Sequence, residues 1–242
     1  MQAIELQNIN VKTVKKNSFR KIIEWLEMPD STIELYSPLN QQRLEVENYI
    51  TKQYKDIYQA EIQEFLPFLM AFQCKNHLSA AVGFKCAVNN PLFVEQYLDD
   101  SVETTMSKLV HQQIERSSII EIGNLAATWK GTSQLVLAIL PIILERAGYK
   151  WAIFTATIQV KKLLSKIQIN MTTLCAADVS RVNNENNMWG TYYEQPSPTV
   201  VFGSLKGMEA RLSKQKIIKN LLEHYSDSID KIVEQLQRQT QP

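Results

Sequence analysis

One carboxylate stands in the middle of a strand-like apolar run of this sequence. Glu121 lies within residues 119–127 (IIEIGNLAA), where Asn124 is the only other side chain with hydrogen-bonding groups. Burying a carboxylate costs free energy unless the group is paired or functional. Burial would also raise its pKa towards the working pH, which suits a general base. The pattern predicts a catalytic base at Glu121, with a structural ion pair or cap at a strand edge as the alternative.

Asn124 follows Glu121 by three positions, a spacing that places two side chains on opposite faces of a regular strand. The two can share a pocket only if the strand is irregular between them, and Gly123 would permit a bulge there. A strand that breaks here and splays from its neighbour exposes backbone groups that can bond an amide-containing chain such as pantetheine. The helix expected to begin near residue 131 offers free N–H groups to a phosphate.

Trp189, Tyr192 and Tyr193 form an aromatic cluster after the polar loop 183–187. They either line a channel for an acyl chain or fill the core, and core packing is the commoner role of such residues. The Tyr193 hydroxyl is the preferred candidate to give a proton to a departing thiolate, and Tyr192 is the second.

A strand-like pattern also covers residues 92–98. Glu95, Tyr97 and Asp99 share one face of such a strand because side chains alternate with a period of two. One interpretation is that these three side chains form an exposed face at the end of a strand.

Apolar periodicity gives the outline of the fold. Strands are expected at 68–74, 80–88, 92–98, 119–127, 151–156, 171–177 and 199–202. Helical patterns occupy 19–28, 40–61, 101–116, 131–147, a segment ending near 167, and 208–240. This order predicts an α/β (α+β) fold whose mixed sheet carries helices on both faces. We expect an N-terminal extension (1–35), a folded domain (36–207) and a C-terminal helix (208–242).

The C-terminal helix carries an apolar stripe with steps of four and three residues. Its members are Ile218, Leu222, Tyr225, Ile229, Ile232 and Leu236. Such spacing fits an amphipathic helix packed on its own domain, and it also fits a homodimer through a coiled coil.

Composition excludes several classes of protein. The chain has 242 residues and a formal net charge of +1, so no broad basic field indicates nucleic acid. Three cysteines and three histidines show no metal-binding spacing, and we expect reduced thiols and no metal. The first residues lack the apolar core of a signal peptide, and residues 135–144 are too short to cross a bilayer. We therefore expect a cytoplasmic protein without a membrane span.

Four blocks in order resemble the bacterial thermostable hemolysin family. They are 91–99 (PLFVEQYLD), 120–126 (IEIGNLA), 151–157 (WAIFTAT) and 189–194 (WGTYYE). The resemblance covers roughly residues 45–205. That family is in turn similar to the GNAT fold and to the acyl-homoserine-lactone synthases. The resemblance implies a GNAT-like, mainly antiparallel central sheet.

The resemblance also implies roles for single residues. Glu121 matches the acid of the synthases' Glu-x-x-Arg motif, which is thought to help deprotonate the attacking amine. Asn124 stands where that motif has its arginine, a departure that counts against homoserine lactone as the product. Glu95, Tyr97 and Asp99 resemble positions that hold the acceptor's amine. From the residues themselves, we expect Asn124 to bind the acceptor near Glu121, and Trp189 and Tyr192 to bind substrate along an acyl channel.

The donor is less defined by the resemblance. The GNAT coenzyme A loop would run from Thr128 to Ser133 but keeps only Gly131 of its signature. An acyl carrier protein is therefore as suitable a donor as coenzyme A. The residues expected to bind the donor are Trp129, Lys130, Gly131, Thr132 and Thr155.

Together, these features predict an N-acyltransferase. It would move an acyl group from a thioester, carried by acyl carrier protein or coenzyme A, to a small amine. Two other classes stay open: a membrane-active hemolysin, and a non-catalytic scaffold that binds an acyl group or a carrier protein.

Overall fold

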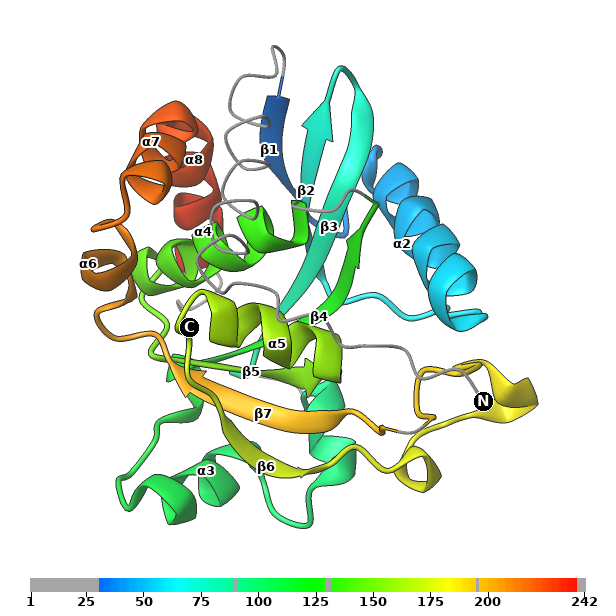
Figure 1. The fold of residues 1–242 in the computed structure, drawn as a ribbon. Coiled ribbons are helices and arrows are strands. Elements are labelled where there is room, and N and C mark those ends of the chain that lie inside the picture. Colours follow the sequence, from blue (N-terminus) through cyan, green and yellow to red (C-terminus); the bar gives the residue numbers. More distant parts are fainter. Residues whose placement is uncertain (1–30, 89–90, 129–131, 195, 239–242) are drawn as a thin grey trace, which may run out of the picture.

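A seven-stranded mixed sheet forms the centre of the computed structural model, which describes residues 31–88, 91–128, 132–194 and 196–238 (Figure 1). The strand order is β1-β2-β3-β4-β5-β7-β6, and every neighbouring pair is antiparallel except β4–β5. The strands are β1 (Ser31–Tyr36), β2 (Phe68–Cys74), β3 (His77–Cys86), β4 (Ile119–Ala127), β5 (Trp151–Ala156), β6 (Thr172–Ala176) and β7 (Thr199–Ser204).

Helices cover both faces of the sheet, because the strands at its centre are apolar on both sides. In β4, Ile119 packs with the cluster that includes helix α3, whereas Ile120 packs with the cluster that includes helix α4. One face carries α2 (Arg43–Tyr58), α3 (Val102–Val110) and the short 3-10 helix η1 (Phe93–Tyr97). The other carries α4 (Thr132–Arg146), α5 (Ile158–Lys166), α6 (Met208–Leu212), α7 (Lys216–His224) and α8 (Ser226–Gln237).

The structure confirms the mixed, mainly antiparallel sheet with helices on both faces. The strands expected at 68–74, 119–127 and 151–156 have the predicted bounds. The strand expected at 92–98 is wrong, because that segment forms η1. β1 begins at Ser31, inside the stretch expected to be an N-terminal extension. The helix expected at 19–28 lies outside the described residues.

The expectation of one long C-terminal helix is also wrong, since the segment forms the three helices α6, α7 and α8. Its apolar stripe is buried in the main core, with Ile229 fully inaccessible and Leu236 only 1% exposed. α8 packs on β1 and α4, and α7 packs on α4. The apolar stripe therefore packs against the core of its own chain.

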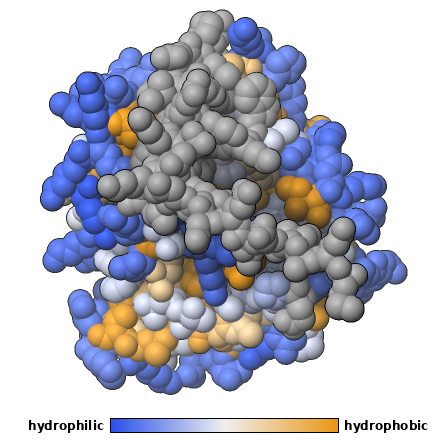
Figure 2. Space-filling model, viewed as in Figure 1, coloured by the Kyte–Doolittle hydropathy of each residue, from blue (hydrophilic) through white to orange (hydrophobic). Residues whose placement is uncertain are grey.

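The visible face outside the grey atoms is mostly hydrophilic, with hydrophobic side chains in separate patches (Figure 2). Within the described ranges, no helix combines the length and the hydropathy that a bilayer crossing requires.

Candidate active site

β4 and β5 separate at the centre of the sheet. They pair in parallel only from Ile119 to Glu121 on β4 and from Trp151 to Ile153 on β5. β5 continues to pair with β7 as far as Ala156, and β4 continues beside β3 as far as Ala127. The two strands therefore diverge directly after Glu121, as the sequence predicted for a splayed pair.

A bulge in β4 lies at the start of this divergence. Asn124 has a φ of 49°, in the left-handed region, and the pairing with β3 shifts by one residue between Gly123 and Ala126. The extra residue brings Asn124 to the same face as Glu121, which a regular strand would not do. The predicted irregularity is confirmed, but Asn124 itself, and not Gly123, takes the left-handed conformation.

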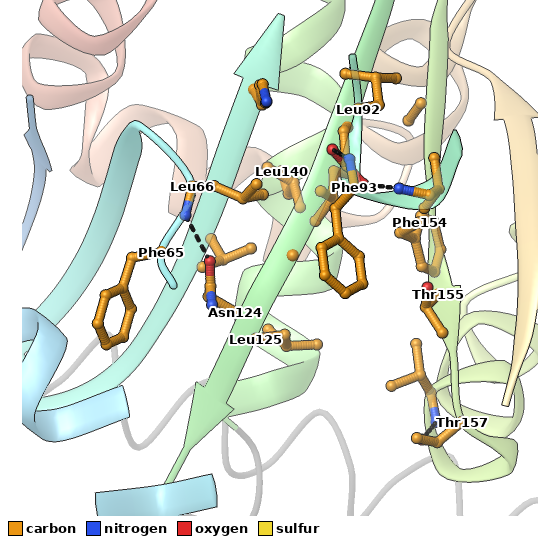
Figure 3. Close-up of a pocket in the computed structure, with 18 of the residues that line it drawn as sticks. Phe65, Leu66, Leu92, Phe93, Asn124, Leu125, Leu140, Phe154, Thr155 and Thr157 are labelled. Carbon is orange, nitrogen blue, oxygen red and sulfur yellow. Dashed lines mark hydrogen bonds between the residues drawn. The ribbon is translucent and has the colours of Figure 1, made fainter. Parts of the chain in front are cut away.

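The Asn124 side chain is fixed by the loop that precedes β2. Its Oδ1 accepts a hydrogen bond from Leu66 N at 2.9 Å (Figure 3). Its Nδ2 donates to Glu64 O at 3.3 Å. Gly83 and Gly123 face each other across β3 and β4, and a Cβ on either would lie 2.9 to 3.0 Å from Leu66 or Asn124 atoms. The two glycines are needed for this close approach of the loop to the sheet.

A cavity of about 480 Å³ passes through the gap between the diverging strands. At the face that carries α2, its rim includes the exposed or half-buried residues Gln63, Glu64, Lys85, Pro91, Gln96 and Asn183. Behind the sheet it ends among buried apolar side chains, including Leu137, Leu140, Leu144, Leu164, Leu205 and Met208. Phe93 reaches from η1 into the gap, between Asn124 and Thr155 in the view of Figure 3. The cavity therefore has a polar entrance and an apolar end.

Glu121 lies where the gap begins and is only 2% exposed. Its Oε2 accepts from Phe93 N and its Oε1 from Val94 N, both at 2.8 Å. Burial raises the pKa of Glu121 to about 7, although these two hydrogen bonds and the charge of Lys85 act in the opposite direction. A carboxyl group with this pKa can accept a proton at neutral pH and release it again.

Two tyrosine hydroxyls meet beside the cavity. Tyr97 and Tyr193 share a hydrogen bond, and Tyr193 lines the cavity while Tyr97 lies behind it at 3% exposure. Burial raises the pKa of Tyr193 to about 12, and it raises that of Tyr97 further, with Tyr193 and Glu121 adding to the rise. The Thr155 hydroxyl on β5 is buried and lies near the Tyr97 hydroxyl. Both phenols are therefore neutral hydrogen-bond donors at pH 7.

An aromatic group surrounds the entrance to the cavity. Trp189 contacts Phe93, Tyr192 and Tyr193 with ring centroids 5.6 to 5.7 Å apart, and Tyr192 stands 5.1 Å from Tyr58 on α2. Three of these, Trp189, Tyr192 and Tyr193, were identified from the sequence, and all three line the cavity.

Gly190 holds this loop against the end of α2. It has a φ of 50°, and a Cβ there would lie 2.2 Å from Tyr58 O. The next residue, Thr191, donates its N–H to the same carbonyl oxygen at 2.7 Å. Glycine therefore permits both the turn and the close contact that place the aromatic side chains.

Glu95 and Asp99 do not lie with Glu121 at the cavity. Arg116 bonds both oxygens of Glu95 at 2.7 and 2.8 Å, and Arg181 bonds Asp99 at 2.8 Å. Burial opposes ionisation of Glu95, but Arg116 and two backbone N–H groups outweigh it and lower its pKa to about 2. The shared strand face expected for Glu95, Tyr97 and Asp99 is wrong, since the segment is helical.

The expected donor loop is only partly described. Trp129, Lys130 and Gly131 lie outside the described residues, as does the side chain of Thr132. Of the expected donor-binding residues, Thr155 lines the cavity. Among the side chains that the structure describes, no group of three or more His, Cys, Asp or Glu residues could hold a metal ion.

Phe93 and Lys85 line the cavity but were not singled out from the sequence. Lys85 stands directly opposite Glu121 in the β3–β4 pairing. Lys85 is the only Lys, Arg, Asp or Glu residue in β3, but its partner Glu121 becomes evident only from the β3–β4 register.

Solved structures show the same fold at low sequence identity. The acyl-homoserine-lactone synthase LasI is similar with a TM-score of 0.51 and 10% identity, over 76% of this chain and 94% of LasI. FeeM, an N-acyl amino acid synthase from uncultured soil microbes, gives 0.53 and 11%, over 76% and 95%. The coenzyme A-dependent acyl-homoserine-lactone synthase BjaI gives 0.53 and 9%, over 77% and 89%. The GNAT-like fold implied by the sequence resemblance is confirmed.

The sequence itself identifies the family. No curated protein sequence matches the chain. The family model described as thermostable hemolysin matches residues 36–208, a range that includes every described residue that lines the cavity. Because this match spans most of the chain, the protein belongs to the thermostable hemolysin family.

Proposed function

We propose that this protein is an N-acyltransferase that moves an acyl group from a thioester to an amine. The observation that carries the proposal is the cavity through the gap between β4 and β5, with Glu121 where the pairing ends. Similar structures include synthases of N-acyl amino acids and of acyl-homoserine lactones. These synthases share one reaction, the transfer of an acyl group to an amine. We propose that reaction for this protein without specifying one donor or one acceptor.

The donor would lie in the gap. Backbone groups of β4 beyond Glu121 and of β5 beyond Ile153 no longer pair with each other, so they are available to the amide groups of a pantetheine arm. The acyl tail would extend into the apolar end of the cavity, where removal from water favours its binding. Either coenzyme A or an acyl carrier protein can present such an arm.

Glu121 would act as the base. The amine gives a proton to Glu121 and its nitrogen attacks the thioester carbon, so a C–N bond forms and the C–S bond breaks. Two backbone N–H groups hold the carboxylate, and each oxygen keeps a second lone pair for the incoming amine. Alignment of the two reactants in one cavity would supply much of the rate enhancement.

Tyr193 would serve as a hydrogen-bond donor to the leaving sulfur. Its pKa of about 12 lies above that of a free thiol, about 8.5, so complete proton transfer to the thiolate is unfavourable. Glu121, with a pKa of about 7, gives up the amine's proton more readily, and that proton completes the free thiol. The balanced products are an amide and a thiol.

The test is thiol release coupled to amide formation. The purified chain is incubated with acyl-coenzyme A and, separately, with acyl carrier protein, each with a mixture of primary amines, and the products are identified by mass spectrometry. Glu121→Gln should lower the rate by roughly 10²- to 10⁴-fold, the usual contribution of a general base. Glu223→Gln, at an exposed position on α7, is the matched control. Full activity of a folded Glu121→Gln variant, or donor binding without any amide product, would overturn the proposal.

A further inference from the structure

Lys85 and Glu121 form a cross-strand pair at the entrance to the cavity. Their Cα atoms are direct partners in the antiparallel β3–β4 pairing, so both side chains point to the same face. Side chains in this relation have Cβ atoms about 4.5 to 5.5 Å apart. Both residues line the cavity, which therefore has a cation beside its candidate base.

The Lys85 ammonium group is not neutralised by Glu121. Its Nζ donates to Pro91 O at 2.7 Å, while the Glu121 oxygens accept the backbone N–H groups of Phe93 and Val94. An ammonium group has three donors, so two remain for a ligand. The charge of Lys85 still acts on Glu121 by lowering its pKa.

No other cation competes for this role among the described residues that line the cavity. Their remaining charged groups are the carboxylates of Glu64 and Glu121. The amide of Asn124 is engaged with Leu66 N and Glu64 O. An anionic group of a ligand that enters here would therefore meet Lys85 first.

We propose that the acceptor is an α-amino acid whose carboxylate is bound by Lys85 while its amine faces Glu121. An amino acid carries its two charges one carbon apart, so it can meet a cation and an anion that stand side by side on one face. The inference rests on the proposed acyl transfer and narrows its acceptor. The carboxylate takes no part in the bond changes: the amine nitrogen gains the acyl group, and the product is an N-acyl amino acid.

The experiment compares acceptors that differ only in the carboxylate. Phenylalanine is set against phenethylamine and phenylalaninamide, and leucine against isoamylamine, with the acyl thioester that gives most product. The wild-type protein should favour each amino acid by roughly 10- to 100-fold in kcat/KM, which is the effect of a charge-assisted hydrogen bond. Assays at pH 9 keep Glu121 ionised, so the comparison does not depend on its protonation.

Lys85→Met should remove this preference by raising KM for the amino acids more than for the amines. Lys85→Arg should keep most of the preference, because the cation is retained. Lys52→Met, at an exposed position on α2, is the matched control. The quantity compared is the ratio of kcat/KM for an amino acid to kcat/KM for the matching amine, so a general loss of activity cancels. The same ratio measured on the wild-type protein tests the proposal even if a variant fails to fold.

Two outcomes distinguish this inference from the proposed function. Equal use of amino acids and their carboxylate-free amines by the wild type, or an equal loss for both in Lys85→Met, would overturn the carboxylate site and leave acyl transfer standing. Absence of transfer to every amine from every donor would overturn both.

Discussion

The raised pKa of Glu121 makes the stability of the protein depend on pH in a way that a single substitution can isolate. Burial moves this pKa from an ordinary 4.5 to about 7 in the folded chain. The folded state therefore holds the proton more tightly than the unfolded state does. The stabilisation that comes from this tighter proton binding is fully present below pH 4.5 and is lost as the pH rises through 7.

The magnitude follows from the shift. A difference of about 2.5 pKa units corresponds to about 3 kcal/mol. About 2 to 3 kcal/mol of this falls between pH 5 and pH 8. Glu121→Gln cannot titrate, so the free energy of unfolding of the variant should rise relative to wild type by that amount across the interval. Any fixed cost of the amide, such as a poor fit to the N–H groups of Phe93 and Val94, is the same at both pH values.

Urea unfolding followed by circular dichroism at pH 5, 6, 7 and 8 measures the difference directly. Glu223→Gln should show no such trend. The kinetic counterpart is a wild-type kcat/KM, expressed per unprotonated amine, that falls about tenfold per pH unit below pH 7, because only ionised Glu121 accepts a proton. A gap between Glu121→Gln and wild type that stays constant from pH 5 to pH 8 would show that the carboxyl does not titrate near neutrality. Glu121 would then not be a base whose pKa is tuned to neutral pH.

Substitutions at three further positions test the construction of the site. Asn124→Ala should destabilise the fold by about 1 to 3 kcal/mol in urea unfolding, because a backbone N–H loses its acceptor, and Asn124→Gly should not recover that bond. Gly190→Ala should lower the melting temperature, since its Cβ would lie 2.2 Å from Tyr58 O; an unchanged melting temperature would contradict the close contact. Met208→Phe should shorten the longest acyl chain accepted, because Met208 lines the buried end of the cavity, and a series of acyl thioesters of increasing length would show no shift if the tail lies elsewhere.

The central strands could be predicted because their sequences are apolar and end at clear signals. β4 and β5 have the bounds expected from the sequence. The segment 92–98 also alternates like a strand, yet Glu121 accepts the N–H groups of Phe93 and Val94. Those groups cannot then pair with a neighbouring strand. The contact joins residues far apart in the sequence, so local pattern could not reveal it.

The C-terminal segment shows a different limit. The stripe that includes Ile218, Ile229 and Leu236 was correctly predicted to be an apolar face, and it is buried. Its spacing did not reveal the interruptions at Ser213 and Tyr225, which separate α6, α7 and α8. Periodicity records which residues are buried, whereas helix ends depend on the surface against which they pack.

Part of the site followed from local chemistry and part required the register of the sheet. The irregularity between Glu121 and Asn124 follows from the period of a strand, because the two must share a face to form one pocket. Lys85 becomes the neighbour of Glu121 only through the β3–β4 register. Glu95 looked equally suited to a site, but Arg116 occupies its carboxylate.

The structural and catalytic interpretations of Glu121 do not exclude each other. By accepting Phe93 N and Val94 N, the carboxylate fixes the start of η1, the segment that brings Phe93 into the cavity. The same two bonds fix the carboxylate, so a base held in this way needs little rearrangement when an amine arrives. A merely structural acid would serve as well with a low pKa, whereas burial raises the pKa of Glu121 to about 7. Its place at the end of the β4–β5 pairing, beside Lys85 and the cavity, is the position from which a base can act on a bound acceptor.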